Sequence, residues 1–273
     1  MWQRFITIIV STFIISITLG LANVESASAA PMNVINGRDV QNEQPWMVGL
    51  LLAEVDDLYN AQFCGGTLIA EEWVLTAAHC TFDLDLSPFA PADLDVVVGS
   101  RTLENGSGTR VAIDRIIRHR DFDFPTYHND IALLHLTEAV DLPTLALPTG
   151  ETALVDETIT AKVMGWGLTE AGMGATTLQQ AELPIVAQET CAAFYANQHY
   201  TVADSMLCAG YQAGGVDACS GDSGGPLVVW DAETLTWVQA GVVSAGAGCA
   251  EPGYFGLYTR VSSYTTWIAE IIG

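Results

Sequence analysis

A serine set between glycines, Ser223, is the feature that most constrains how this chain can fold. It lies in Asp217-Ala-Cys-Ser-Gly-Asp-Ser-Gly-Gly-Pro226, with one acid directly before it and another six positions upstream. Glycine permits sharp backbone turns and lets N–H groups approach a bound carbonyl closely. A serine hydroxyl becomes a good nucleophile only when a base removes its proton and a further group orients that base. The fold must therefore bring a histidine from elsewhere to Ser223.

The positions of the histidines relative to Ser223 in the sequence distinguish between the folds that use such a serine. Gly221-Asp-Ser-Gly-Gly225 also satisfies the G-x-S-x-G turn of α/β-hydrolases, in which the histidine follows the serine. All five histidines of this chain precede Ser223, which excludes that fold. An order with the acid before the histidine, as in subtilisins, is not excluded by position alone.

Two further segments resemble those of the chymotrypsin/trypsin-like serine proteases. Thr76-Ala-Ala-His79-Cys80, preceded by Cys64-Gly-Gly66, is similar to that family's histidine segment, and His128-Asn-Asp130-Ile-Ala-Leu-Leu134 to its aspartate segment. The order histidine, aspartate, serine also matches. The resemblance covers nearly everything after Val34 and implies an all-β fold of two six-stranded antiparallel β-barrels with a C-terminal helix. The other histidines are predicted to be surface or hydrogen-bonded polar residues: His119, His128, His135 and His199.

Short β-rich runs separated by turn residues independently predict an all-β fold. They form two series joined by an extended linker over 141–148, which contains two prolines. We expect a peptidase domain over 34–273, with barrels over 34–145 and 146–273, and a helix over 262–272 capped by Ser262 or Ser263. The expected strands are 46–52, 66–70, 73–77, 94–99, 110–118, 130–136, 160–165, 178–186, 226–230, 236–244 and 256–261.

The resemblance implies a role for each residue of the site. Asp130 would orient His79, which would take the proton of Ser223 and deliver it to the leaving amine during acyl-enzyme hydrolysis. The backbone N–H groups of Gly221 and Ser223 would hold the developing oxyanion. Ser244 matches the family position that supports the buried aspartate.

Specificity follows from the same resemblance. Asp217 falls at the base of the primary pocket, and Gly246 and Gly256 fall on two walls that leave room for a long side chain. This set predicts cleavage after Arg or Lys. Ala218 replaces a serine found in many trypsins, which predicts a preference for Arg. Ala245 replaces a tryptophan, so the preference for residues further from the cut does not follow from the family.

The cysteines favour an oxidised, exported protein. An even number of them in an exported chain predicts three disulfides, and the competing zinc interpretation lacks C-x-x-C or H-x-x-x-H spacing. The resemblance implies the pairs Cys64–Cys80, Cys191–Cys208 and Cys219–Cys249.

The N-terminal segment predicts export. Arg4, an apolar run over 5–22 and Ala27-Ser-Ala29 are typical of a secretory signal peptide over 1–29. An uncleaved anchor helix is the alternative, because the run could just span a bilayer. The expected location is extracellular or periplasmic, with no membrane attachment once the signal is removed.

The resemblance also implies a zymogen with a propeptide over 30–33. Val34-Ile-Asn-Gly37 is similar to the family's mature start, and the new ammonium of Val34 would meet Asp222. The preceding residue, Asn33, does not suit a pocket for basic side chains, so we expect a different protease to activate the chain.

The charge of the chain limits its partners. The formal net charge is −23, and only Lys162 and seven arginines follow the signal. This excess of acidic over basic residues predicts that the protein does not bind nucleic acid and that it attracts cationic substrates. The small number of basic residues also leaves few cut sites for an enzyme that cleaves after Arg or Lys. We expect a monomer that acts on proteins or peptides containing Arg or Lys and that meets protein inhibitors. No cofactor or metal is expected, and no calcium in the loop after Gly99.

Two alternatives remain at this level. The chain could be an inactive binding protein with a protease fold, although such proteins usually lose a triad residue. It could also be a protease tethered to a membrane by its N-terminal segment.

Overall fold

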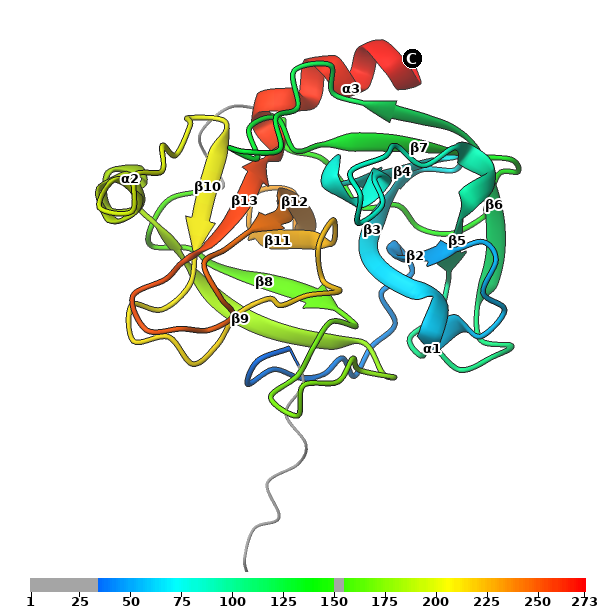
Figure 1. Cartoon of the computed structure of the whole chain (residues 1–273), viewed down its shortest axis with the longest axis horizontal. Helices are drawn as coiled ribbons and strands as arrows, with labels where there is room; N and C mark the ends of the chain where they lie inside the picture. Colours follow the sequence, from blue (N-terminus) through cyan, green and yellow to red (C-terminus); the bar gives the residue numbers. More distant parts are fainter. Residues whose placement is uncertain (1–33, 150–154) are drawn as a thin grey trace, which may run out of the picture. The chain divides into compact units, whose positions relative to one another are not determined.

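The computed structural model describes residues 34–149 and 155–273 (Figure 1). The predicted signal peptide and propeptide lie outside these residues. Among the helices that the structure describes, none is long and apolar enough to cross a membrane.

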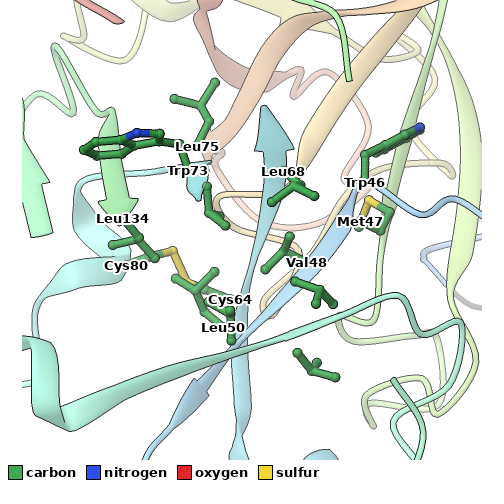
Figure 2. Packing of buried hydrophobic residues seen from close by; sticks show 14 of the residues in the cluster. Trp46, Met47, Val48, Leu50, Cys64, Leu68, Trp73, Leu75, Cys80 and Leu134 are labelled. Carbon is green, nitrogen blue, oxygen red and sulfur yellow. A yellow bond between two sulfur atoms is a disulfide. The ribbon is translucent and has the colours of Figure 1, made fainter. Parts of the chain in front are cut away.

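The first barrel contains six antiparallel strands, closed in the order β2-β3-β4-β7-β6-β5. Apolar side chains fill it, and Figure 2 shows Leu50, Leu68 and Leu134 among these core residues, together with the Cys64–Cys80 disulfide. Burial of such side chains stabilises the fold by roughly 1.5–3 kcal/mol each. The strands are β2 (Met47–Leu52), β3 (Gln62–Ala70), β4 (Trp73–Thr76), β5 (Leu94–Val98), β6 (Thr109–Arg118) and β7 (Ala132–Leu136).

The second barrel closes through the pairing of its first two strands, in the order β9-β10-β13-β12-β11-β8. The two-residue strand β1 (Arg38–Asp39) adds to β9 by pairing with Gln179 and Gln180. The other strands are β8 (Thr160–Gly165), β9 (Gln179–Val186), β10 (Met206–Ala209), β11 (Pro226–Asp231), β12 (Thr236–Ala245) and β13 (Gly256–Arg260). The predicted fold of two six-stranded barrels is confirmed.

All eleven predicted strands are present, and β10 is a sixth strand of the second barrel that the sequence pattern missed. Its four residues, Met-Leu-Cys-Ala, are all buried, so they show no alternation that would identify a strand. Strand β3 begins four residues before its predicted start at Gly66. A side chain at Gly66 would place its Cβ 2.8 Å from Val74 on β4, so this glycine allows close packing rather than ending the strand.

The helices are short. They are α1 (Leu58–Ala61), α2 (Gln188–Ala196) and α3 (Thr265–Ile272), with the 3-10 turns η1 (His79–Thr81), η2 (Pro91–Asp93) and η3 (Val261–Tyr264). The predicted C-terminal helix is confirmed, but its predicted serine cap is wrong. Ser262 and Ser263 already lie within η3, and the cap residue Tyr264 makes no side-chain capping bond. Helix α3 is held instead by Ile268, which is buried in the same cluster as the first barrel.

The segment between the barrels binds both of them. Leu145 N donates to Leu68 O of β3 at 3.0 Å, and Gln239 N of β12 donates to Ala146 O at 3.0 Å. This backbone pairing fixes the two barrels against each other, because each contributes one side of the bonds.

The structure contains three disulfides, Cys64–Cys80, Cys191–Cys208 and Cys219–Cys249, which are the pairs that the resemblance implies.

Candidate active site

The predicted histidine and aspartate are in direct contact. His79 opens η1 directly after β4, and Asp130 precedes β7. His79 Nδ1 lies 2.7 Å from Asp130 Oδ2, and the backbone N–H of His79 donates to Oδ1 at 2.8 Å. Both carboxylate oxygens are used, so the imidazole has one defined orientation. Nδ1 is then the donor to Asp130, and Nε2, which lies 3.7 Å from the disulfide-bonded Cys80 Sγ, is left to accept a proton.

The second barrel completes the environment of Asp130. Ser244 Oγ of β12 donates to Asp130 Oδ2 at 2.5 Å, and Thr259 Oγ1 of β13 donates to the Asp130 carbonyl at 2.7 Å. Asp130 is fully buried. A buried carboxylate requires such partners, because an unsatisfied charge in the interior is costly. The pair His79–Asp130 therefore depends on side chains from both barrels.

The pKa of His79 reflects two opposing effects. Burial disfavours the charged imidazolium and lowers the pKa, whereas the charge of Asp130 and its hydrogen bond raise it. The two contributions of Asp130 prevail, so the pKa of His79 lies above its ordinary value of 6.5. His79 is thereby a stronger base than an isolated histidine.

Backbone contacts hold Ser223 and Gly224 against strands β3 and β4 of the first barrel. The Ser223 carbonyl accepts from Gly65 N at 2.7 Å. The next residue, Gly224, has φ +79°, and a Cβ there would lie 2.2 Å from Thr76 Oγ1, so only glycine fits. Within the described residues, Ser223 Oγ forms no hydrogen bond to His79. In the absence of substrate such bonds are often long, and they tighten when the substrate binds.

Two N–H groups, one on each side of Asp222 in the sequence, have no acceptor in the described part of the chain. Over 221–225, the N–H groups of Asp222, Gly224 and Gly225 donate to carbonyls. Among the described residues, those of Gly221 and Ser223 make no hydrogen bond. Gly221 has φ +96°, a conformation open to glycine. Free, fixed donors beside a serine can stabilise an oxyanion.

A cavity of about 260 Å³ opens beside Ser223, with Asp217 in its lining. Asp217 is 5% exposed, and within the described residues its oxygens accept only from the N–H groups of Ala218 at 2.8 Å and Ala250 at 3.2 Å. Burial raises the pKa of Asp217 to about 6, against the lowering effect of these two bonds. No basic side chain of the described residues pairs with Asp217, so the cavity offers a carboxylate to a cationic group.

The walls of the cavity explain its shape. A Cβ at Gly256 would lie 3.0 Å from Asp217 Oδ1 and 2.9 Å from the ring of Tyr258, so glycine keeps the cavity clear. The Cys219–Cys249 disulfide joins two walls. The predicted residues Asp217, Ala218, Ser223, Ser244, Gly246 and Gly256 all line it.

The sequence reasoning missed two residues of this region on β13, Tyr258 and Thr259. Tyr258 lines the cavity, and its buried hydroxyl has no partner in the described structure. Thr259 binds the Asp130 carbonyl. Neither belongs to a recognisable motif, because their positions arise from the pairing of β13 with β10 and β12.

The acid next to Ser223 has a separate environment. Asp222 is fully buried, and it accepts from Gly167 N at 2.8 Å and Cys219 N at 2.9 Å. Burial is the main cause that raises the pKa of Asp222 to about 6. Val34 is fully buried in the apolar cluster of the second barrel, and Asp217 N donates to Ile35 O at 3.4 Å. The segment after Val34 is thus packed beside the candidate pocket.

Over 34–149 and 155–273, the remaining titratable groups suggest no second centre. Cys64, His79 and Cys80 are the one group of potential metal ligands close together in the described part of the chain, but both cysteines are joined in a disulfide. Of the other histidines, His128 contacts the Thr201 carbonyl, His135 contacts Asp114, and His199 is exposed.

Comparison with known proteins extends over nearly all of this structure. A family model described as "Trypsin" matches residues 34–268. Trypsin-1 of Astacus astacus is 38% identical over 218 residues, which is 77% of this chain and 88% of that protein. Transmembrane protease serine 9 of Rattus norvegicus is 38% identical over 234 residues, which is 84% of this chain but only 21% of that longer protein.

Proposed function

This chain belongs to the trypsin family of serine endopeptidases, and we propose that it cleaves proteins and peptides after arginine and, less well, after lysine. The observation that carries this specificity is Asp217, a buried carboxylate without a basic partner in the described structure, in the cavity beside Ser223. A guanidinium can form two parallel hydrogen bonds to a carboxylate. A neutral side chain would leave the charge buried and unpaired, at a cost of several kcal/mol.

In the proposed mechanism, Ser223 Oγ attacks the scissile carbonyl while His79 Nε2 takes its proton. Asp130 keeps Nδ1 protonated and stabilises the imidazolium that forms. The N–H groups of Gly221 and Ser223 bind the oxyanion, each contributing about 3 kcal/mol at the transition state. His79 then protonates the leaving amine, and water hydrolyses the acyl-enzyme by the same route. The complete set of groups gives no support to a non-catalytic binding role.

A peptide library tests the specificity. We expect the chain that starts at Val34 to cleave after Arg, with a lower kcat/KM after Lys in matched sequences. The reason is that Ala218 carries no hydroxyl to assist the shorter lysine side chain, whereas a guanidinium reaches Asp217 directly. Equal turnover of matched Arg and Lys peptides would refute the preference, and cleavage after neutral residues would refute the role of Asp217.

The pH dependence should show two ionisations. His79 must be neutral, and its pKa is raised above 6.5, so kcat/KM for an arginyl peptide should fall as the pH drops through that higher value. Asp217 must be ionised to bind the cation, and its pKa is about 6, so the fall should steepen below pH 6. The slope of log kcat/KM against pH should then rise from about one to about two. A slope that stays at one down to about pH 5 would contradict this assignment.

We further propose that the chain is secreted as a zymogen and activated by another protease at Asn33–Val34. Support comes from the burial of Val34, the fully buried Asp222 and the signal-like N-terminal segment. The new ammonium of Val34 would pair with Asp222 and order Gly221 beside it. The same proposal includes a monomeric protein with domains over 34–145 and 146–273. Its expected partners are an activating protease and protein inhibitors. N-terminal sequencing of exported protein distinguishes it from a membrane-tethered form, because only release yields Ala30 or Val34 as the first residue.

Replacing Asp222 by asparagine tests the activation step. An unpaired buried ammonium costs about 3–5 kcal/mol, so the variant should fold but lose roughly 10²- to 10⁴-fold in kcat/KM. Asp156→Asn, an exposed carboxylate in the second half of the chain, is the matched control and should keep full activity. Full activity in Asp222→Asn would count against the mechanism.

A further inference from the structure

The residue two places after Val34 contacts two other loops of the molecule. Asn36 has φ +55°, in the left-handed region, which asparagine adopts more readily than most residues with a side chain. Its backbone N–H donates to the carboxylate of Glu170, and its side-chain amide donates to the carbonyl of Gly215. These partners lie 134 and 179 positions away in the sequence. Asn36 therefore joins the start of the proposed mature chain to two distant segments.

The loop that carries Glu170 also holds the segment around the oxyanion donors. Gly167 N donates to Asp222 Oδ1 at 2.8 Å, and Leu168 N donates to the carbonyl of Ser220 at 2.7 Å. The two acceptors lie on either side of the first proposed oxyanion donor in the sequence. A displacement of the Glu170 loop would therefore disturb both of these bonds.

The loop that carries Gly215 leads to the base of the pocket. Gly215 N donates to Ala250 O at 2.8 Å, and Ala250 N donates to the carboxylate of Asp217 at 3.2 Å. Asp217 N donates to Ile35 O at 3.4 Å, and these two residues form an isolated antiparallel bridge. The contact between Asn36 and Gly215 adds a second connection beside this bridge.

We infer that Asn36 and Glu170 are positioning residues, which hold the segment after Val34 in its inserted place and so stabilise the ordered oxyanion segment and pocket. The inference rests on the proposed activation at Asn33–Val34. Insertion of the new N-terminus and ordering of the two loops depend on the same contacts, so each favours the other. Removal of either contact should raise the fraction of molecules in which the N-terminus is withdrawn.

Chemical labelling of the Val34 amine tests the inference. Cyanate carbamylates amines that are accessible, so the buried amine of the chain that starts at Val34 should react slowly, as measured by mass spectrometry of the N-terminal peptide. E170A and N36G should each react about three- to ten-fold faster, because each loses one hydrogen bond. Glycine suits the φ of this position, so N36G removes the side-chain contact and keeps the backbone conformation. E157A removes another exposed carboxylate of the second half of the chain and should react like the unaltered chain.

Ligand binding distinguishes a positioning role from a general loss of stability. Benzamidine carries an aromatic amidinium and should pair with Asp217, which favours the ordered pocket. Because pocket order and insertion favour each other, saturating benzamidine should slow the labelling of E170A and N36G. Faster labelling that benzamidine leaves unchanged would show a general loss of stability and would overturn the inference.

The labelling rates also separate this inference from the proposed activation. A rate equal to that of E157A overturns the role of the residue replaced, while slow labelling of Val34 in the unaltered chain leaves the activation proposal standing. Rapid labelling of Val34 in the unaltered chain overturns both. Hydrolysis of an arginyl peptide by the same samples tests the cleavage specificity separately.

Discussion

Replacing Ser223 by alanine should lower kcat on an arginyl peptide by about 10⁶-fold. The hydroxyl is the nucleophile that attacks the peptide bond in the proposed mechanism, and without it no acyl-enzyme can form. The oxyanion donors and the cavity remain, so substrate should still bind and a small residual rate should persist. Hydrolysis of the peptide by purified variant and unaltered enzyme measures the effect.

A folding defect must be distinguished from this loss. Ser223 is only partly buried, and its structural contact is made by its backbone carbonyl, which alanine retains. The thermal unfolding midpoint should therefore be unchanged, and binding of a competitive arginyl inhibitor should be preserved. Retention of more than about a hundredth of the activity would contradict the assigned nucleophile, given the expected 10⁶-fold effect.

Replacing Asp130 by asparagine should lower kcat by about 10⁴-fold. The two oxygens of Asp130 accept from the backbone N–H and Nδ1 of His79, and Ser244 also donates to one of them. The amide of asparagine replaces one of the two acceptor oxygens by an NH₂ donor. If this NH₂ group faces His79, it favours the imidazole tautomer in which Nδ1 is the acceptor. Nε2 is then protonated and cannot take the proton of Ser223.

The pH profile gives this variant a second readout. The charge of Asp130 raises the pKa of His79, so its removal should move the acidic limb of kcat to lower pH. The matched control is Asp114→Asn, because Asp114 Oδ1 lies 2.7 Å from His135 Nδ1 in a similar pair outside the site. The control should keep its kcat. Equal losses in the two variants would show that a general structural effect, not the orientation of His79, is responsible.

Local patterns located most of the strands, but two errors show their limits. Strand β10 escaped detection because all of its four residues are buried, so its identity depends on the neighbours β9 and β13. The serine cap of the last helix was wrong because η3 extends the helical turn through Ser262 and Ser263. For β10, contacts between distant segments decide the structure, whereas for the helix a continuous local turn displaces the expected cap.

Those residues of the candidate site that belong to sequence motifs could be predicted. Three segments in the right order identified His79, Asp130 and Ser223, and the resemblance supplied the cysteine pairs and the pocket residues. Tyr258 and Thr259 could not be found in this way, because strand pairing alone brings them to the cavity and to Asp130.

The sequence by itself determined the identity of the chemical groups: a serine between glycines, a histidine before it in the chain, and acids at two distinct positions beside it. Only the tertiary structure decided their environments. Burial raises the pKa values of Asp217 and Asp222 to about 6, and every lysine and arginine of the described chain except Arg101 and Arg120 lies in a paired strand. The physical reason is that desolvation and hydrogen-bond satisfaction depend on atoms from segments far apart in the chain, which no local pattern encodes.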